Sequence, residues 1–428
     1  MATYLIFSDL HVSGGGAADP WNARRQKAFE EITNAALPGQ NFADDSVELI
    51  FNGDTFDFLN TPPSLINHSA ADVSSAHEKW SAIAAAHEPW FQALRAFTSI
   101  PGRKITFLIG NHDLELWYPS IRARIRSAIH AAPGLVQFCL TQSYQPRTDL
   151  VIEHGCQQDI FNHIPIIWEP TTEPSGPDHL EHNDMRTAPV GDIKLPWGSR
   201  YYYLILKPML EMYPYFINMD PELTLPEQIA LFCLLQPESA AQNAIKTQQL
   251  LTSPVTLPSY SAGDIAKLFA DITQLQNQII SELNETIPMP APTYDSLEEY
   301  DRLLNILKFS SVSDALRSII TTHHNERPVH LAPQNTAFYI YGHTHFAGRW
   351  RNGANQTAIN TGTWIPQFAR PKAAEWNPEY EQWFMQPNSA PYPGADTSRF
   401  TLAWTRAYPH SASSTELIEW RNGSFQLV

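Results

Sequence analysis

Residues 3–11, Thr-Tyr-Leu-Ile-Phe-Ser-Asp-Leu-His, place a short apolar run directly before Asp9 and His11. Runs of about five β-branched and aromatic residues are typical of strands buried on both faces in α/β proteins. The same arrangement recurs four times, with Val47–Phe51 before Gly53-Asp54-Thr55-Phe56-Asp57, Ile105–Ile109 before Gly110-Asn111-His112-Asp113, Leu150–Ile152 before His154-Gly155, and Ala337–Tyr341 before Gly342-His343-Thr344-His345. We therefore expect all five polar runs at the carboxyl ends of strands, where α/β sheets bind ligands.

Helical patterns separate the first three of these strands, at Arg24–Leu37 and about Ser75–Thr98. Strand, polar loop, helix and strand in succession predict βαβ units and an α/β fold. The pattern changes after His345, where successive strands and a tight Asn422-Gly423 hairpin indicate a second, largely antiparallel sheet. Those strands are expected at Thr357–Gly362, Phe400–Trp404, Glu416–Trp420 and Phe425–Val428.

A long insertion lies between the fourth and fifth polar runs. Residues from about 160 to 200 are rich in Pro, Asp, His and Trp, and the following stretch to His324 is mainly helical in pattern. Its clearest helical segments are Pro226–Leu235, Ser261–Leu283 and Leu297–Leu307. We therefore predict a core formed by residues 1–160 and 336–428, and an inserted helical cap over 161–335 that selects the substrate.

Composition narrows the class of protein. The 428 residues carry 28 Lys and Arg against 44 Asp and Glu, a formal charge of −16, which argues against an extended nucleic acid as partner. No apolar run approaches the ~20 residues that span a bilayer. Three widely separated cysteines argue against a disulfide framework and fit a reducing, cytoplasmic location. Cys156, two positions after His154, is interpreted as a small buried residue rather than a ligand.

The five polar runs together supply carboxylate, imidazole and amide groups for two adjacent metal ions. Such a centre cleaves phosphoesters with a metal-activated water. Imidazoles mixed with oxygen ligands favour Mn, Fe, Zn or Co over Ca. A spacing of two along a strand would place Asp9 and His11 on one face, so that both reach the same ion.

In order and spacing, the runs resemble the D-x-H, G-D-x-x-D, G-N-H-D/E, H-G and G-H-x-H motifs of the calcineurin-like metallophosphoesterase superfamily. The resemblance covers residues 1 to about 160 and 336–364. It implies two packed β-sheets flanked by helices, an αββα sandwich, around two divalent transition-metal ions (Mn, Fe or Zn). It also implies a ligand set in which Asp54 bridges the ions, Asp9, His11 and His345 hold the first, and Asn111, His154 and His343 hold the second.

The resemblance further assigns His112 to protonating the leaving group, with Asp57 orienting its ring, while a metal-bridging hydroxide attacks phosphorus in line. A carboxylate partner would raise the pKa of His112 and keep it protonated near neutrality. The alternative for His112 is a hydrogen-bonded residue that only supports the ligands. Asp113 is expected to support its loop and not to bind metal.

Substrate contacts are less sharply indicated. His154-Gly155-Cys156-Gln157-Gln158-Asp159-Ile160-Phe161-Asn162 is similar to an H-G-H-x-x-D-x-x-N pattern of some bacterial branches, with Cys156 replacing the second His. Asn162, His163 and Arg200 are the candidate substrate-binding residues, although core packing of the cap is the favoured interpretation of the Arg200 segment. The run Asn360–Trp364 fits either a strand-end turn with a packing Trp or a substrate contact.

The sequence thus favours a hydrolase of a small phosphoester, such as a nucleotide derivative, sugar phosphate or lipid head group. A metal-dependent nuclease is the first alternative, and Arg122-Ala123-Arg124-Ile125-Arg126 is the one compact basic run that could serve it. The second alternative is a non-catalytic scaffold with the same fold. Retention of the whole ligand set and of His112 argues against it.

Overall fold

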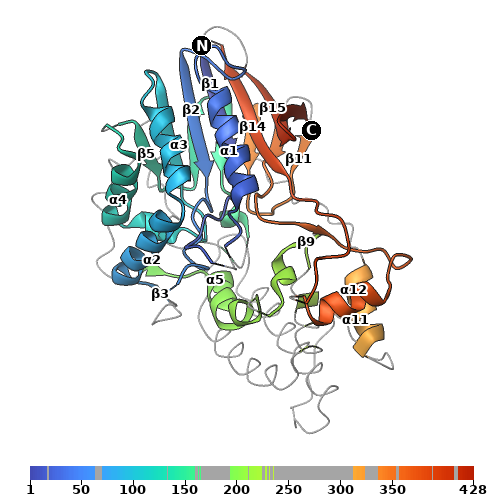
Figure 1. Cartoon of the computed structure of the whole chain (residues 1–428). Coiled ribbons are helices and arrows are strands. Elements are labelled where there is room, and N and C mark those ends of the chain that lie inside the picture. The colour runs from blue at the N-terminus through green and yellow to red at the C-terminus, as the bar shows by residue number, and fades with distance from the viewer. Residues whose placement is uncertain are drawn as a thin grey trace, which may run out of the picture. The chain divides into compact units, whose positions relative to one another are not determined.

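The computed structural model describes residues 1–16, 19–62, 70–132, 134–159, 162, 164, 193–210, 212–223, 227, 228, 231, 235, 312–322, 336–352, 356–387, 389–408 and 413–428 (Figure 1). The chain divides into two compact units. Unit 1 comprises Met1–Ser199, Pro328–Ile365 and Arg399–Val428, and unit 2 comprises Arg200–Arg327 and Pro366–Ser398. Within the described residues, no helix combines the length and the apolar character needed to cross a membrane.

The larger sheet of unit 1 has the strand order β16-β15-β14-β1-β2-β4-β5. Strands β1, β2, β4 and β5 run parallel to one another. Strand β14 pairs antiparallel with both β1 and β15, and β15 pairs antiparallel with β16. Parallel strands of this kind need crossover connections, which the intervening helices supply. The strands are β1 (Ala2–Phe7), β2 (Ser46–Asn52), β4 (Arg103–Leu108), β5 (Val136–Cys139), β14 (Phe400–Ala407), β15 (Ser414–Arg421) and β16 (Ser424–Leu427).

The smaller sheet of unit 1 has the order β11-β12-β10-β7-β6. Its central strand, β10, is parallel to both β7 and β12, whereas β6 and β11 are antiparallel edge strands. The strands are β6 (Ser143–Arg147), β7 (Leu150–Glu153), β10 (Phe338–Tyr341), β11 (Gly348–Asn352) and β12 (Gln356–Asn360). A separate two-stranded ribbon pairs β3 (Ala70–Ala71) with β8 (Ile193–Lys194) in antiparallel orientation.

Apolar side chains from both sheets form one core between them. The larger sheet contributes residues such as Ile6 and Ile50, and the smaller sheet contributes Ile152, Ile340 and Ile359, all fully buried. Burial of each such side chain stabilises the fold by about 1.5–3 kcal/mol. The two sheets are therefore packed face to face.

Helices cover the other face of the larger sheet, with α1 and α3 in front of the strands in Figure 1. Rings from the helices contact rings from the strands: the ring centroid of Phe51 in β2 lies 6.1 Å from that of Phe29 and 5.5 Å from that of Trp90. The helices of unit 1 are α1 (Ala23–Ala35), α2 (Val73–Ala86), α3 (Glu88–Thr98) and α4 (Pro119–Ile129), with short turns η1 (Leu114–Trp117) and η2 (Cys156–Gln158). The expected α/β class with two sheets flanked by helices is confirmed.

Two expectations about local structure are wrong. The strands after Asn360 do not build a sheet of their own, because β14 pairs with the free edge of β1 and extends the larger sheet. The single helix expected over Ser75–Thr98 is broken at His87, whose ψ of 36° is not helical. Pro89 explains the break, since proline has no N–H to donate to the preceding turn and is tolerated only at the start of a helix.

The described part of unit 2 is mainly helical. Helix α5 (Trp197–Tyr201) begins in unit 1 and ends in unit 2. It is followed by η6 (Tyr202–Leu206), α6 (Lys207–Leu210) and η7 (Pro214–Ile217). Unit 2 also contains α11 (Val312–Thr321), α12 (Pro378–Met385) and a two-stranded ribbon of β9 (Met219–Asp220) with β13 (Phe368–Ala369). Arg370 pairs with buried Glu227 at 3.0 Å and donates to the carbonyls of Ile319 and Ile320. These bonds satisfy carbonyls at the end of α11.

The expected core of residues 1–160 and 336–428 and the expected cap over 161–335 stay predictions, because most of the insertion lies outside the described residues. The expected helices Ser261–Leu283 and Leu297–Leu307 lie outside the described residues, as does most of Pro226–Leu235. The role of a cap over 161–335 stays a prediction.

Candidate metal centre

The five polar runs follow five strand ends drawn from both sheets. Strands β1, β2 and β4 of the larger sheet lead into the first three runs, and β7 and β10 of the smaller sheet lead into the last two. Carboxyl ends of parallel neighbours lie at the same edge of a sheet. Because the sheets pack face to face, these loops meet at one edge of unit 1.

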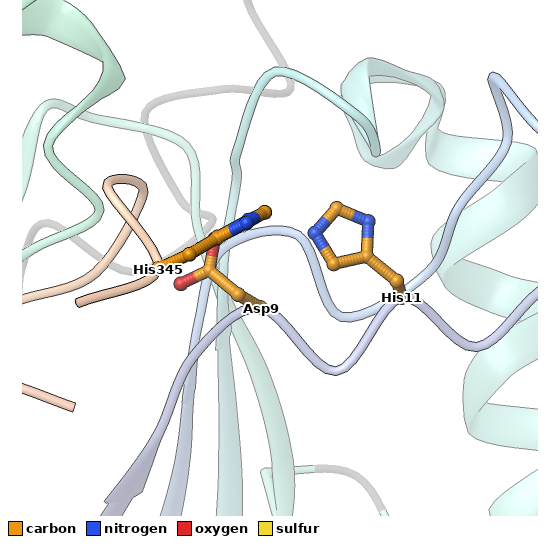
Figure 2. Close-up of side chains that lie close together, drawn as sticks. All are labelled: Asp9, His11 and His345. Atoms are coloured by element: carbon orange, nitrogen blue, oxygen red, sulfur yellow. The ribbon is translucent and has the colours of Figure 1, made fainter. Parts of the chain in front are cut away.

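The first cluster, which we call the Asp9 group, consists of Asp9, His11 and His345 (Figure 2). One ligand atom from each lies within 4.8 Å of the others. Asp9 Oδ1 is 3.4 Å from His345 Nε2, and Asp9 Oδ2 accepts a hydrogen bond from the backbone N–H of His343 at 3.0 Å. Burial would raise the pKa of Asp9, but the neighbouring His345 and His154 outweigh it, and the pKa of this carboxyl is lowered.

The second cluster, the Asp54 group, consists of Asp54, His154 and His343 and meets the same 4.8 Å limit. Asp54 Oδ2 lies 3.3 Å from His154 Nε2, and Asp54 Oδ1 accepts from the backbone N–H of His112 at 2.8 Å. His154 Nδ1 lies 2.9 Å from the carbonyl oxygen of Asn52. Burial favours the neutral ring of His154, yet the Asp54 charge raises its pKa to about 9.

The two groups are adjacent through Asp54. Its Oδ2 lies 4.0 Å from His11 Nε2 of the Asp9 group while contacting His154. Asn111 belongs beside the Asp54 group, because its Oδ1 is 3.3 Å from His154 Nε2. The structure therefore brings together all seven residues predicted as metal ligands.

Donor chemistry and missing partners fit divalent ions at this place. Asp9 Oδ1 and His11 Nε2 are buried and have no hydrogen-bond partner within the described part of the chain. A buried polar atom without a partner costs about 1–3 kcal/mol, which coordination to a cation would offset. Mixed imidazole and carboxylate donors suit transition metals such as Mn, Fe and Zn.

His112 and Asp57 lie next to these groups. His112 Nδ1 is 3.1 Å from Asp57 Oδ1, and His11 Nδ1 is 3.4 Å from Asp57 Oδ2. Burial lowers the pKa of His112, but the charges of Asp57 and Asp54 overcome this and raise it to about 9. The same contacts, against an opposing effect of burial, hold the pKa of Asp57 well below its usual range. The His112 side chain keeps 18% of its surface exposed, so its ring can reach a bound molecule.

Backbone conformation explains how the side chains of Asp9 and His11 come close together. We expected both residues to lie on one face of a strand, and this is wrong, because β1 ends at Phe7. Both residues follow the strand in left-handed backbone, with φ of 52°. Left-handed backbone at non-glycine residues is costly and concentrates at functional sites. Asp54, His343 and His345 share this feature, with φ of 48°, 67° and 58°.

Two neighbouring residues keep the loops in place. Asp113 accepts from the backbone N–H groups of Gly110 at 2.6 Å and Thr55 at 2.9 Å, so it supports the loop as expected. Gly53 has φ of 77°, and a Cβ there would lie 2.4 Å from Cγ of His154. Only glycine allows this close approach.

The predicted substrate-binding residues and Cys156 lie in different parts of the structure or outside the described residues. Asn162 lies beside Asn111, whose Nδ2 donates to Asn162 Oδ1 over a long 3.5 Å. Arg200 is half-buried in α5 at the start of unit 2, and His163 lies outside the described residues. Cys156 is buried, and burial raises the pKa of its thiol.

Trp364 of the Asn360–Trp364 run is fully buried and stacks on Trp21 at 5.9 Å, with its indole N–H donating to Thr401. Packing is therefore the correct reading of this tryptophan. Its two sequence neighbours in the turn, Thr363 and Thr361, bond to the backbone of Asp9 and to Ser8 respectively, so the turn braces the first polar run.

Asp159 was not predicted as a site residue. Its Oδ2 lies 2.9 Å from Nε2 of His343. The only sequence signal for it is its place five residues after His154, in the H-G-H-x-x-D-x-x-N-like segment.

The basic run in α4 does not form a cationic surface. Arg122 is buried and donates to the carbonyls of Leu116 and Trp117. Arg126 donates to Val136 and lies over the Phe138 ring. Only Arg124 of the three arginines is exposed.

Comparisons with known proteins add little to this geometry. No protein-family model matches the chain, and no curated protein matches it. Among solved structures, the crystal structure of a dimetal phosphatase from Danio rerio aligns over 97% of this chain and 94% of that chain, at 11% identity and a TM-score of 0.30. A likeness at that TM-score carries no argument about fold or function.

Proposed function

We propose that this chain is a dinuclear-metal-dependent phosphoester hydrolase of the metallophosphoesterase type, acting on a small phosphoester. One observation carries the proposal: the Asp9 group and the Asp54 group, from four segments far apart in the chain, lie side by side with Asp54 in contact with both. Two sets of donors around one shared carboxylate suit a pair of cations. A site that binds a single structural metal ion does not need a carboxylate shared between two sets of ligands.

In this proposal Asp9, His11 and His345 would hold one ion, Asn111, His154 and His343 would hold the other, and Asp54 would contribute to both. Bound divalent ions of this kind, such as Mn, Fe or Zn, lower the pKa of a coordinated water and neutralise charge on the phosphoryl group. The protein's part is to fix the donors. Asp57 holds the His11 ring at 3.4 Å, and Asn52 holds the His154 ring at 2.9 Å.

His112 is proposed to donate a proton to the leaving oxygen. Asp57 contacts Nδ1 of the ring, and we propose Nε2 as the atom that gives its proton to the substrate. The Asp57 carboxylate also stabilises the charged imidazolium, the form that can act as an acid. A positioned acid of this kind contributes about 10²–10⁴-fold to the rate.

A small substrate fits the charge of the protein better than a polynucleotide does. The chain carries a formal charge of −16, and two of the three arginines in its compact basic run are engaged with backbone or aromatic partners. We propose that residues 161–335 select among nucleotide derivatives, sugar phosphates and lipid head groups. Arg200 and His163 are the proposed contacts.

The test is hydrolysis of p-nitrophenyl phosphate and bis(p-nitrophenyl) phosphate by protein loaded with Mn, Zn or Fe, beside Asp54→Ala and His112→Ala. We expect turnover by wild type, its loss in Asp54→Ala, and a much smaller decrease in His112→Ala, because a nitrophenyl leaving group needs no proton. A single-stranded DNA substrate in the same panel identifies a nuclease if it is the preferred substrate. Wild type as inert as the two variants with every metal would leave the non-catalytic scaffold as the better reading.

A further inference from the structure

We propose that Asp159 and Asn162 form a positioning bridge that fixes two ligands of the second metal ion, His343 and Asn111. The inference rests on the proposed function, because it concerns the same metal centre. Neither residue is needed as a ligand itself. Their role is to set the orientation of two side chains that reach the ion from different segments of the chain.

The first half of the bridge is the contact between Asp159 and His343. Asp159 Oδ2 lies 2.9 Å from His343 Nε2, and the His343 side chain is only 11% exposed. A carboxylate accepts but does not donate, so the ring donates from Nε2 and keeps its lone pair on Nδ1. A histidine that binds metal through one nitrogen commonly donates the other N–H to a carboxylate, which fixes the ring and makes it a stronger ligand.

The second half runs through Asn162 to Asn111. Asn162 Nδ2 donates to Asp159 Oδ2 at 2.7 Å, and its Oδ1 accepts from Asn111 Nδ2 at 3.5 Å. With its amide nitrogen turned to Asn162, Asn111 presents Oδ1 to His154 Nε2 at 3.3 Å. Oxygen is the atom of an asparagine that can bind a cation, so the bridge selects the competent orientation of this amide.

The local backbone holds Asp159 and Asn162 at this separation. The N–H of Asp159 donates to the carbonyl of Cys156 at 3.1 Å, and the N–H of Asn162 donates to the carbonyl of Asp159 at 3.2 Å. A Cβ on Gly198 would come within 2.3 Å of Asn162 Oδ1. Glycine at this position therefore leaves the room that the Asn162 amide occupies.

The bridge also assigns Asn162 a role other than the expected one. Both polar atoms of its side chain have partners within the bridge. An amide engaged at both ends is better suited to positioning than to recognising a substrate.

The experiment measures Mn²⁺ binding to the full-length, metal-stripped protein by isothermal titration and by metal content after dialysis. Asp159→Ala removes the bridge, Asp159→Asn keeps an acceptor but removes the charge, and Asn162→Ala breaks the link to Asn111. Asp45→Asn is the matched control, since the Asp45 side chain is 89% exposed and forms an ion pair with the amino terminus at 2.8 Å. Thermal melting of each metal-free variant checks that the fold is retained.

We expect Asp159→Ala to weaken binding of one of two Mn²⁺ ions by about 10–100-fold, leaving the other unchanged. The Mn²⁺ affinity of Asp159→Asn should lie between that of Asp159→Ala and that of wild type, and Asn162→Ala should weaken binding of the same ion. The electron paramagnetic resonance signal of a coupled Mn²⁺ pair should give way to that of single ions at limiting metal. Asp45→Asn should match wild type.

Wild-type affinity for both ions in Asp159→Ala and Asn162→Ala would overturn the bridge while leaving the proposed function standing. Two-ion binding that depends on Asp159, in a protein that hydrolyses no phosphoester, would support the bridge and sink the function. A wild type that binds no Mn²⁺ would overturn both.

Discussion

The Asp9 group and the Asp54 group use similar side chains but differ in how the protein holds them. Both histidines of the Asp54 group have a ring nitrogen 2.9 Å from a protein oxygen, that of Asn52 for His154 and that of Asp159 for His343. In the Asp9 group, by contrast, Asp57 lies farther from the His11 ring, at 3.4 Å, and Asp9 Oδ1 and His11 Nε2 lack hydrogen-bond partners among the described residues. We therefore expect the ion of the Asp9 group to supply interactions that its ligands lack in the protein, whereas the ion of the Asp54 group would bind ligands that protein contacts already hold in place.

Backbone conformation follows the same division. Every member of the Asp9 group has a positive φ, and in the Asp54 group His154 does not. Left-handed backbone costs about 1–3 kcal/mol at each non-glycine residue. The Asp9 group thus combines left-handed backbone at all three residues with a longer contact to its positioning carboxylate, 3.4 Å from Asp57 to His11, and we infer that it binds its ion less tightly.

Asp54 belongs to both sites, so its loss should have the largest effect. Asp54→Ala should lower kcat/KM for p-nitrophenyl phosphate on the order of 10⁴–10⁶-fold, because two electrostatic contributions of about 10²–10³ each are lost. Metal analysis should show both ions depleted. Retention of one ion at full occupancy would mean that the two groups are independent.

His112 should matter to chemistry and not to metal binding, which separates it from both groups. His112→Ala should lower kcat by about 10²–10⁴-fold for a substrate with a poor leaving group, and much less for a nitrophenyl ester, whose leaving group needs no proton. Steady-state kinetics on an alkyl and a nitrophenyl phosphoester measures the contrast. An equal loss on both esters would contradict a proton-donor role.

The inferred difference in affinity can be measured directly. Increasing chelator concentration should remove metal from wild type in two steps separated by about tenfold or more, since supporting hydrogen bonds to ligands are worth about 10–100-fold in affinity. His345→Ala should delete the step at low chelator, and His154→Ala the step at high chelator. Loss of the high-chelator step in His345→Ala and of the low-chelator step in His154→Ala would show that the Asp9 group binds its ion more tightly, which contradicts the inferred difference.

The smallest effect concerns the buried pair beneath Asp57. Lys79 and Glu115 are both buried, with Nζ and Oε1 3.9 Å apart, and burial raises the pKa of Glu115 to about 7 in the folded protein. Because the folded state holds this proton more tightly than the unfolded state, the favourable contribution is complete below about pH 4.5 and is lost as pH rises through about 7.

Glu115→Gln should therefore raise the free energy of unfolding, relative to wild type, by about 1–3 kcal/mol more at pH 8.5 than at pH 5.5. Thermal melting of both proteins at the two pH values measures the difference. The same difference at both pH values would show that Glu115 does not titrate in this range.

Much of the site was predictable because its signals are local. Each ligand follows an apolar run that forms a strand, and the order of the runs along the chain is enough to indicate a shared edge. Asp159 carries no such signal. It stands in a short irregular turn, and its contact with His343 joins residues 184 positions apart.

Strand partnership was the weakest part of the fold prediction for the same reason. Phe400–Trp404 is recognisable as a strand from its own residues, but its pairing with the strand Ala2–Phe7 depends on which edge is left free when the βαβ units assemble. The positive φ of Asp9 and His11 was equally hidden, since nothing in Ser-Asp-Leu-His distinguishes a strand from a left-handed turn.

Anomalous diffraction from crystals of the Mn²⁺-loaded protein tests most directly whether the two groups form one paired centre. We expect two peaks about 3.5–4 Å apart, one among Asp9, His11 and His345, the other among Asn111, His154 and His343, with Asp54 touching both. A single peak, or manganese bound away from these seven side chains, would contradict the paired centre.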